Sequence, residues 1–434
     1  MLKNLPPLSI LLFGYILYTC FGWALLSLPV VQTEDVEPID SLFIAASAVS
    51  TTGLTTVDVG TSYNGFGQTL ILLLIQAGGI GFMTFSSFLL LATNHKLSRE
   101  RAKVAKTAFA LPDDFGPARF VWYVIRFTLL VELAGAIALW WIFSANDVER
   151  PLWNALFHSV SAFCTAGFSL FPDSLNRFST SPAVCLVVSC LSFAGAIGFV
   201  VVADLWNRIS GRQPHIHFFS RVVFRVTFWF VLTGTVLVYN LSSELRELPV
   251  GDGILMSFFQ VMSATTTVGF SSVDVASFPA AVIMLFFFMM IFGASPSGTG
   301  GGLKSTTLAT LVGLVNSTLK RRKSVTLYGR TLSDDHLRQA TASLAFYLML
   351  LFTAVLLLLV FEPSSLDALL FEAISALGTV GLSMGVTGNL TDPSKVLLVF
   401  LMLVGRIGVL SFGLAVSMED EEPDAQQGEG ELPL

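Results

Sequence analysis

The chain has 434 residues, of which 53% are hydrophobic and only 12% are charged, with a formal net charge of −6 and a mean hydropathy of +0.74. A soluble domain carries about 25% charged residues. This composition therefore excludes an ordinary soluble domain and indicates an integral membrane protein.

Eight apolar segments follow one another along the chain, and most have the roughly 20 residues that a helix needs to cross a bilayer. They are Leu8–Val31, Phe66–Ala92, Phe120–Phe143, Pro182–Trp206, Val222–Leu241, Phe278–Phe292, Ala340–Phe361 and Val396–Val416. The first lacks a small-residue cleavage site, so we interpret it as a retained span and not as a signal peptide. The sequence predicts an all-α membrane protein with eight transmembrane helices.

The positions of lysine and arginine predict the orientation of these helices. Basic residues gather in three loops, at 96–119, 208–221 and 320–338. The four segments on the opposite side of these spans, which carry the repeated motif described below, hold only Arg150, Arg177, Arg246 and Lys395. Because cytoplasmic loops carry the excess of basic residues, we expect these three loops and both termini in the cytoplasm. The basic loops then report topology and imply no nucleic acid. Residues 419–434 form an acidic tail, which we expect to be a solvated cytoplasmic end.

A nine-residue motif, Ser-Ala-x-x-Thr-x-Gly followed by Leu or Phe and then Ser or Thr, occurs four times between the apolar segments. Its copies begin at Ser47, Ser161, Ser263 and Ser375, and their glycines are Gly53, Gly167, Gly269 and Gly381. A phenylalanine stands ten residues before each glycine, at Phe43, Phe157, Phe259 and Phe371. The glycines lie 114, 102 and 112 positions apart. We therefore divide the chain into four repeats, at 1–95, 96–208, 209–325 and 326–418.

Each repeat is typical of an outer helix, a half-helix, a re-entrant loop and an inner helix. In the second repeat Pro151 can begin a helix at its first turn, and Trp153–Phe163 is too short to cross a bilayer. Non-helical backbone at membrane depth is tolerated only where protein buries it or water lines it. Four such loops predict a pore, with the four helix–pore-loop–helix repeats around a pseudo-fourfold axis.

We expect the Thr-x-Gly triplet of each motif to line an ion filter with backbone carbonyls. Glycine adopts the positive φ that turns successive carbonyls inward, and the threonine can add a hydroxyl or brace the loop. The C-terminal ends of four half-helices would favour a cation, and two triplets read Thr-Val-Gly, the core of the potassium-channel filter signature. A glycine-terminated helix copied by duplication is the alternative. The filter residues predicted here are Thr51, Thr52, Gly53, Thr165, Ala166, Gly167, Thr267, Val268, Gly269, Thr379, Val380 and Gly381.

The inner helix of the third repeat is interrupted by a glycine-rich run, Gly293–Ser305, which also contains Pro296. A helix does not accommodate this composition, so we expect helix to resume near Thr306. The run lacks Gly-Lys-[Ser/Thr], so we do not interpret it as a phosphate-binding loop. The other inner helices carry glycine pairs at 79–81, 195–198 and 405–408, which we interpret as sites of close helix packing. The run itself predicts a gate under the filter, with a passive kink as the alternative.

Arg406 is the one charged residue between Lys395 and Glu419. A charge near the bilayer centre costs about 3 kcal/mol or more unless it faces a cavity or a partner. We expect Arg406 to project toward the pore, to donate hydrogen bonds to the glycine-rich run and to repel cations. Glu132 is expected to satisfy a neighbouring helix, and Asp204 has helical ion-pair spacing to Arg208. The predicted gate comprises Gly298, Thr299, Gly300, Gly301, Gly302, Lys304 and Arg406.

Taken together, the four repeats, one glycine per filter, the glycine-rich run and Arg406 resemble the Trk/Ktr/HKT superfamily of potassium transporters over essentially the whole chain. Because the chain starts directly with the first repeat, it is more similar to the Ktr-type membrane subunit than to the Trk type. Plant relatives with serine at the first filter glycine prefer sodium, so Gly53 favours potassium. Cys164 and Gly378 stand where the other copies have the hydroxyls of Ser50 and Thr266, which leaves the coordination of the deeper sites open.

The resemblance implies potassium ion as the substrate, in the plasma membrane (the bacterial inner membrane), with no organic cofactor in this chain. It also implies a homodimer in membrane lipid, with one pore per protomer. A cytoplasmic ring of nucleotide-binding regulatory subunits, of the KtrA or TrkA type, is the implied partner.

Three alternatives remain open. The first is a member of the same superfamily that is permeable to sodium or uses sodium ion as an activator or coupled ion. The second is a secondary transporter of another solute, although such folds usually have two inverted repeats and here each motif follows an outward crossing. The third is a membrane enzyme, which needs a polar dyad within the spans. His158, in the second half-helix, has no evident partner for that role.

Overall fold

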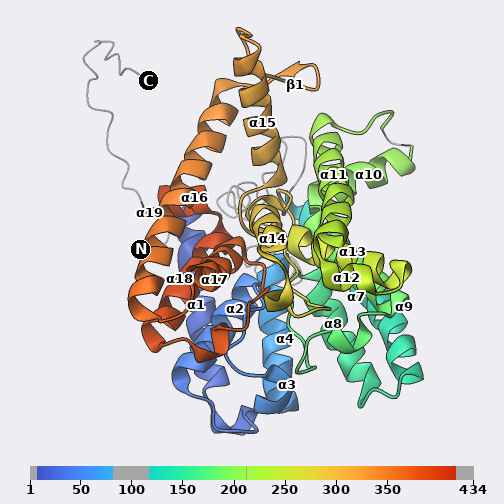
Figure 1. Ribbon diagram of the computed structural model, residues 1–434, viewed down its shortest axis with the longest axis vertical. Helices are drawn as coiled ribbons and strands as arrows, with labels where there is room; N and C mark the ends of the chain where they lie inside the picture. Colours follow the sequence, from blue (N-terminus) through green and yellow to red (C-terminus); the bar gives the residue numbers. More distant parts are fainter. Residues whose placement is uncertain (1–6, 82–116, 212, 417–434) are drawn as a thin grey trace.

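The computed structural model describes residues 7–81, 117–211 and 213–416 (Figure 1). These residues form helices joined by loops, together with one small hairpin of β1 (Thr326–Leu327) and β2 (Arg330–Thr331), in which Thr326 pairs with Thr331. Shorter helical segments complete the described part of the chain: η2 (Pro29–Val31), α3 (Val59–Ser62), η3 (Asn176–Phe178), α12 (Ser243–Glu247), η4 (Val275–Ser277) and η5 (Thr387–Asn389). The fold is therefore helical, as the sequence predicts.

In the described part of the chain, four long helices are apolar enough to cross a membrane. They are α1 (Pro7–Leu26), α7 (Pro117–Ala145), α11 (Phe218–Leu241) and α16 (Asp334–Phe361). Their surfaces carry large exposed apolar side chains such as Leu17, Trp141 and Phe352. Extended exposed apolar surface of this kind marks contact with lipid or with another protein.

A half-helix follows each long helix and ends at one copy of the motif. These are α2 (Pro38–Ser50), α8 (Pro151–Phe163), α13 (Val250–Thr266) and α17 (Leu366–Gly378). Proline stands in the first turn of α2 and α8, where its missing N–H is not needed. With 13 to 17 residues, these helices are shorter than a bilayer span.

After the motif each chain segment forms a second helix. These helices are α4 (Gly65–Ile80), α9 (Pro182–Ala196), α14 (Ala280–Phe292) and α18 (Asp392–Ile407). Within the described residues, three of them continue beyond a break as α10 (Phe199–Ile209), α15 (Ser305–Leu319) and α19 (Val409–Val416). The start of α15 agrees with the expected resumption of helix near Thr306. In Figure 1, α15 and the hairpin project from one end of the molecule.

The predicted spans Pro182–Trp206 and Val396–Val416 are each divided into two helices in the structure. The helices α9 and α10 are bent by 98° at Gly198, and α18 and α19 are bent by 98° at Gly408. These two glycines have φ of 95° and 94°, a conformation that residues with a side chain rarely adopt. Gly81 ends α4 with the same sign of φ, 89°. The second glycine of each pair therefore ends or breaks its helix.

A glycine three residues before each of these breaks, at Gly78, Gly195 or Gly405, allows close helix packing. A Cβ atom there would collide with the backbone carbonyl of a residue near the end of the half-helix in the same helix group. A helix group here means the long helix, the half-helix and the second helix that surround one copy of the motif. Gly293, at the end of α14, makes the same approach. The four pairs are Gly78 with Val49, Gly195 with Phe163, Gly293 with Thr265 and Gly405 with Leu377.

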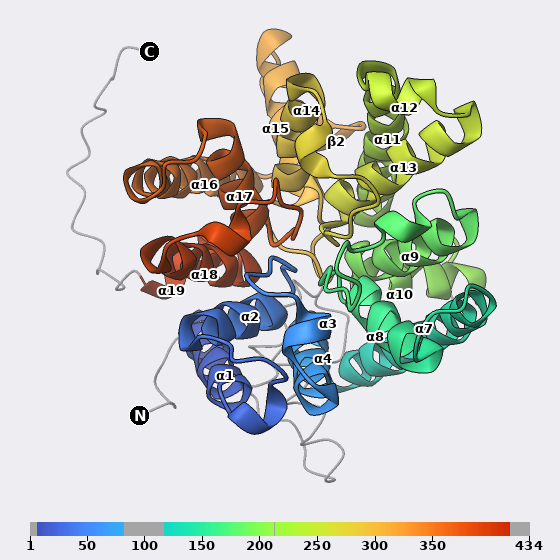
Figure 2. The same cartoon turned by 60° about the horizontal axis from the view of Figure 1, so that its bottom comes forward.

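Each second helix also packs against the half-helix of another group. The contacts join α4 to α8, α9 to α13, α14 to α17, and α18 back to α2. Figure 2 shows these helix groups around a common centre, with the loops that follow the half-helices directed toward it. Within the described residues, four helices can cross a membrane, or up to six if each bent pair is one span. The expected eight-helix count stays a prediction.

Candidate functional site

Every half-helix ends in the same backbone conformation. The threonines of the motif have φ between 48° and 57°, and its glycines have φ between 64° and 94°. Positive φ at the glycines was expected from the sequence. At a threonine it costs roughly 1–2 kcal/mol, and such strain persists only where the surrounding structure holds it. The threonines are Thr51, Thr165, Thr267 and Thr379.

The first serine of each motif fixes this conformation, a role that the sequence analysis missed. All four serines are buried. Ser47 and Ser375 accept hydrogen bonds from the motif glycines, Gly53 N and Gly381 N, both at 3.0 Å. Ser161 and Ser263 donate instead to the carbonyls one residue past the glycine, Phe168 O at 2.8 Å and Phe270 O at 2.6 Å. The sequence contains a signal for this role, because serine begins all four copies of the motif.

The four motif glycines, which the sequence predicts to be filter glycines, adjoin one another in a closed ring. A Cβ atom built on each glycine would collide with the carbonyl of the residue that precedes another filter glycine. The approach of one loop to the next therefore requires a residue without a side chain. The fourth contact returns to the first loop, so the circle is complete. The contacts are Gly53 with Ala166, Gly167 with Val268, Gly269 with Val380 and Gly381 with Thr52.

A cavity of about 360 Å³ opens on one side of this ring. All four filter glycines line it, together with the hydroxyl residue two positions after each glycine. Asp58 also lines the cavity, and its carboxylate accepts hydrogen bonds from Gly60 N at 2.7 Å and Thr61 N at 3.3 Å. The mouth of the ring is therefore polar. The four hydroxyl residues are Thr55, Ser169, Ser271 and Ser383.

On the other side of the ring the motif threonines meet the glycine-rich loop, residues 293–304. Thr51 Oγ1 donates to Thr299 O at 3.4 Å, and Thr165 Oγ1 donates to Thr299 Oγ1 at 3.0 Å. A Cβ atom on Gly300 would collide with Thr267 Oγ1, and one on Gly301 would collide with the side chain of Thr379. The loop therefore touches all four threonines.

Two of these threonine hydroxyls, Thr267 Oγ1 and Thr379 Oγ1, are buried and have no hydrogen-bond partner among the described residues. An unpaired buried hydroxyl costs about 1–3 kcal/mol. Its oxygen can therefore gain by facing a cation. This pair of oxygens lies directly between the ring and the loop.

Arg406 joins the loop to two of the second helices. Its guanidinium donates to the carbonyls of Thr299 and Gly78, to Gly79 O at 3.1 Å and to Thr51 Oγ1 at 3.0 Å. The expected hydrogen bond from Arg406 to the loop is present, whereas the bonds to α4 were not expected. Lys304 Nζ donates within the loop, to Gly300 O at 2.8 Å and Gly301 O at 3.1 Å. Two basic side chains, Lys304 and Arg406, are thus held by hydrogen bonds to the loop, below the ring.

The chain matches the family model TrkH, described as cation transport protein, over residues 24–426. This chain belongs to the TrkH family. Because the family consists of transport proteins, membership identifies a transporter and not an enzyme.

Relatives of this TrkH-family chain match it over nearly its whole length. It is 34% identical over 405 residues to Ktr system potassium uptake protein B of Vibrio alginolyticus. The aligned region covers 92% of this chain and 88% of the relative. It is 32% identical over 445 residues to Potassium/sodium uptake protein NtpJ of Enterococcus hirae. That alignment covers 100% of this chain and 98% of the relative. The crystal structure of the potassium transporter TrkH from Vibrio parahaemolyticus aligns with a TM-score of 0.76 at 20% identity, covering 96% and 86% of the two chains. This last similarity shows the same fold.

Three other polar residues of the TrkH-family chain lie outside the ring and the loop. Glu132 Oε2 accepts from Gln76 Nε2 at 3.1 Å, so Glu132 satisfies a neighbouring helix as expected. Asp204 accepts from His217 N at 2.9 Å and contacts His217 Nδ1 at 2.5 Å, which corrects the expected pairing with Arg208. His158, for which the sequence indicates no evident dyad partner, has its Nε2 atom 2.9 Å from Ser169 Oγ.

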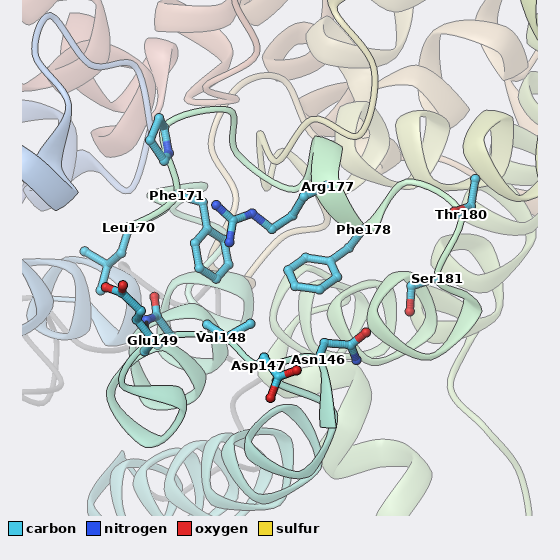
Figure 3. A pocket seen from close by; sticks show the side chains of 12 residues that line it. Asn146, Asp147, Val148, Glu149, Leu170, Phe171, Arg177, Phe178, Thr180 and Ser181 are labelled. Carbon is cyan, nitrogen blue, oxygen red and sulfur yellow. Dashed lines mark hydrogen bonds between the residues drawn. The ribbon is translucent and has the colours of Figure 1, made fainter. Parts of the chain in front are cut away.

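A larger cavity of about 660 Å³ lies beside the ring mouth (Figure 3). Its lining comes from the α7–α8 loop, from Asn154 of α8 and from residues between 170 and 181, so one helix group forms it alone. Phe171 and Pro172 line both cavities, and the Arg177 guanidinium lies 4.4 Å from the centre of the Phe171 ring. This cavity includes no filter glycine and no residue of the glycine-rich loop. The ring, and not the larger cavity, is the candidate functional site.

Proposed function

We propose that this chain is a potassium uptake transporter and that the ion passes through the ring of four filter glycines. The closed ring of glycine contacts is the observation that carries the proposal. Backbone carbonyls arranged around one axis can replace the water around a potassium ion. Four half-helices ending at the ring add partial negative charge, which favours a cation over an anion. The names of two relatives that are 32–34% identical, which refer to potassium uptake, support the choice of ion.

In this proposal four repeats, at 1–95, 96–208, 209–325 and 326–418, surround a pseudo-fourfold pore. Each repeat contributes two spans, and the broken second helices count as one span each. The ring mouth faces the outside of the plasma membrane, and α15, the hairpin and both termini face the cytoplasm. The basic loop at 320–338 supports this orientation, because cytoplasmic loops carry the excess of lysine and arginine.

The glycine-rich loop, with Lys304 and Arg406, forms the gate of the proposed pore. Its contact with all four motif threonines supports a barrier directly below the filter. The guanidinium of Arg406 raises the energy of a cation at that depth. Opening then requires the loop to leave the threonines and to break the hydrogen bonds from Arg406.

Regulation by a cytoplasmic ring of nucleotide-binding subunits, of the KtrA or TrkA type, completes the proposal, with the transporter as a homodimer. The arrangement of α15 supports this control. Ser305, the first residue of α15, directly follows Lys304 of the loop, and the helix extends to the projecting hairpin (Figure 1). A movement of the hairpin would therefore reach the loop through one helix.

Rubidium uptake by the purified protein in liposomes tests the proposed ion path. We expect uptake that potassium inhibits more strongly than sodium does. The Gly53→Ser variant should lose discrimination between the two ions, since the added side chain enters the ring. Unchanged discrimination in a folded variant would exclude Gly53 from the filter.

A second variant tests the gate separately. Deletion of several residues within Gly298–Gly302 should increase the rate of rubidium uptake, because the barrier is shortened while the ring is left intact. Unchanged or lower uptake in a well-folded deletion variant would reject the loop as a barrier and leave the filter untouched.

The name of the Enterococcus hirae relative, a potassium/sodium uptake protein, favours a second candidate, in which sodium ion activates or accompanies potassium transport. A sodium gradient imposed across the liposome membrane distinguishes the two. Rubidium uptake that follows the sodium gradient at constant membrane potential would establish coupling. Uptake that follows the membrane potential alone would establish channel-like flux.

A further inference from the structure

The residue nine positions before each filter glycine is buried behind the turn that follows the filter. In all four helix groups this side chain is fully buried, and the residues are Ile44, His158, Gln260 and Glu372. Two positions after each glycine stands the hydroxyl residue that lines the ring mouth. Three of the four groups join these two positions by a hydrogen bond between side chains.

Glu372 makes the most extensive of these connections. Its Oε1 accepts from Ser383 Oγ at 2.6 Å and from Met384 N at 3.1 Å, and its Oε2 accepts from Thr387 Oγ1 at 2.7 Å. Ser383 Oγ in turn accepts from Gly385 N at 2.8 Å. The carboxylate thus holds the post-filter turn at three points.

Gln260 makes the corresponding connection in the third group. Its Nε2 donates to Ser271 Oγ at 2.9 Å and to Val273 O at 3.0 Å. The Ser271 hydroxyl also donates to Val273 O. Here the side-chain amide holds the same serine and the backbone two residues beyond it.

His158 does the same in the second group. Its Nδ1 lies 2.8 Å from Asn154 O, and a carbonyl only accepts, so Nδ1 carries the proton and Nε2 of the neutral ring accepts from Ser169 Oγ at 2.9 Å. Ser169 Oγ accepts from Phe171 N at 2.9 Å. The imidazole stacks on Phe171, with ring centres 4.5 Å apart, and the Arg177 side chain extends over the same ring (Figure 3).

The first group shows that the fold itself does not need a polar residue at this position. Ile44 is as buried as the other three. Its side chain has no hydrogen-bonding atom, so Thr55 receives no side-chain hydrogen bond from this position. A buried polar side chain is costly unless it is paired, and an apolar side chain would fill the same space. The three polar residues therefore call for a role in addition to packing.

We propose that His158, Gln260 and Glu372 are positioning residues that set the ion specificity of the ring. The inference rests on the proposed function of the ring as a cation filter. Each of them fixes the serine two residues past a filter glycine, and so fixes where that glycine and its carbonyl stand relative to the axis. Because the filter replaces the water shell of the ion, a small outward or inward displacement of one loop changes how well it fits potassium and sodium. We call the three side chains the filter braces.

Rubidium uptake by liposomes that contain Glu372→Leu, Glu372→Gln, Ser383→Ala and the double variant of Glu372→Leu with Ser383→Ala tests the proposal. We expect Glu372→Leu to raise KM for rubidium and to lower rubidium-over-sodium discrimination by about tenfold, the scale of a lost hydrogen bond to a charged group. The maximal rate should change less than KM. Glu372→Gln keeps an acceptor for Ser383 and Met384, so it should stay within about threefold of the wild type.

The double variant separates a brace from a general loss of packing. If the two side chains act through one hydrogen bond, the double variant should be no worse than the worse single variant, because interacting residues are not additive. Ile374→Val is the matched control: Ile374 lies on the same half-helix, is buried and has no side-chain hydrogen-bonding atom. It should leave KM and discrimination unchanged.

Several outcomes would overturn the proposal. These are a folded Glu372→Leu variant with wild-type KM and discrimination, or additive effects in the double variant. If Glu372→Leu does not assemble, Ser383→Ala and Ser271→Ala decide by the same criteria, since each removes a single oxygen atom. If liposomes with the wild-type protein take up rubidium selectively and those with the variants do so equally, the role of the filter braces is rejected, whereas the proposed filter is not. Wild-type liposomes without selective uptake would reject both.

Discussion

The ammonium group of Lys395 lies 2.6 Å from the carboxylate of Asp40, a residue 355 positions earlier in the chain. Lys395 is in α18 and Asp40 is in the first turn of α2, and both side chains are largely buried. The pair therefore joins the last helix group to the first, where the ring of groups closes. Removing one partner leaves the other charge buried without compensation.

We expect Lys395→Met to lower the free energy of unfolding by about 3–5 kcal/mol, the usual cost of breaking a buried ion pair. The double variant Asp40→Leu with Lys395→Met should recover most of this loss, because it strands no charge. Thermal unfolding of the purified protein measures both, with the exposed Lys323→Met as the control. A double variant less stable than Lys395→Met alone would show that the ion pair itself, and not the stranded charge, stabilises the ring.

A second prediction separates the conformation of a filter glycine from its contact with the next loop. Gly269 and Gly329 both have positive φ, 80° and 79°, but a Cβ atom on Gly269 would collide with Val380 O whereas one on Gly329 meets nothing within 4 Å. Alanine at either position should cost roughly 1–2 kcal/mol of backbone strain. Only Gly269→Ala should also raise KM for rubidium, by about tenfold or more.

Rubidium uptake and thermal unfolding of the two variants, measured side by side, check this expectation. Gly329 lies in the β1–β2 hairpin, away from the ring, so Gly329→Ala reports the strain alone. Equal effects of both variants on KM would mean that the ring contact is unimportant for ion binding.

The sequence could locate the ring because its parts are repeated. Four copies of one motif at domain-sized intervals identify Gly53 and its three counterparts, and positive φ at glycine follows from elementary sterics. The left-handed conformation of Thr51 and the matching threonines could not be read in this way, since threonine gives no preference for it. Only the buried serine that begins each motif explains how that conformation is held.

Other parts were missed because their meaning depends on distant partners. The glycine pairs in the second helices are typical of helix packing, and nothing local distinguishes Gly195, which packs, from Gly198, which breaks the helix. Arg406 could be assigned to the loop by alignment of the repeats. Its bonds to Gly78 and Gly79 arise only because the last helix group lies beside the first. The roles of the ring as a filter and of the loop as a gate stay predictions.

The breaks in the second helices lead to a third prediction. Gly408 has φ of 94°, and its nearest neighbour for an added Cβ atom is Ser411 Oγ at 3.7 Å. Gly408→Ala should therefore cost only the backbone strain, about 1–2 kcal/mol. Gly198→Ala has the same strain and in addition a collision with Pro296 O, so it should destabilise the protein more.

Thermal unfolding ranks these two variants against Gly65→Ala. Gly65 lies at the start of α4 without positive φ, and an added Cβ atom there meets nothing within 4 Å, so that control should be neutral or slightly stabilising. If Gly198→Ala proved no less stable than Gly408→Ala, the glycine-rich loop would be able to move and accommodate the Cβ atom added at position 198.

The last prediction concerns the hydrogen bonds of Arg406. Glutamine at this position removes the charge and cannot span Thr299, Gly78, Gly79 and Thr51 together. Each charged hydrogen bond contributes about 1.5–3 kcal/mol, so the loop should leave the threonines more often and rubidium uptake should rise severalfold. Arg406→Lys keeps the charge but loses the planar, multidentate geometry, and we expect an intermediate rate.

Initial rates of rubidium uptake, with thermal unfolding as the check on folding, distinguish the possible roles of Arg406. A rate for Arg406→Lys equal to that of the wild type would mean that the positive charge alone forms the barrier. Slower uptake in a folded Arg406→Gln variant, at unchanged KM, would mean that Arg406 supports permeation. In that case the bonds to Thr299 would stabilise the conducting arrangement of the loop and not the closed one.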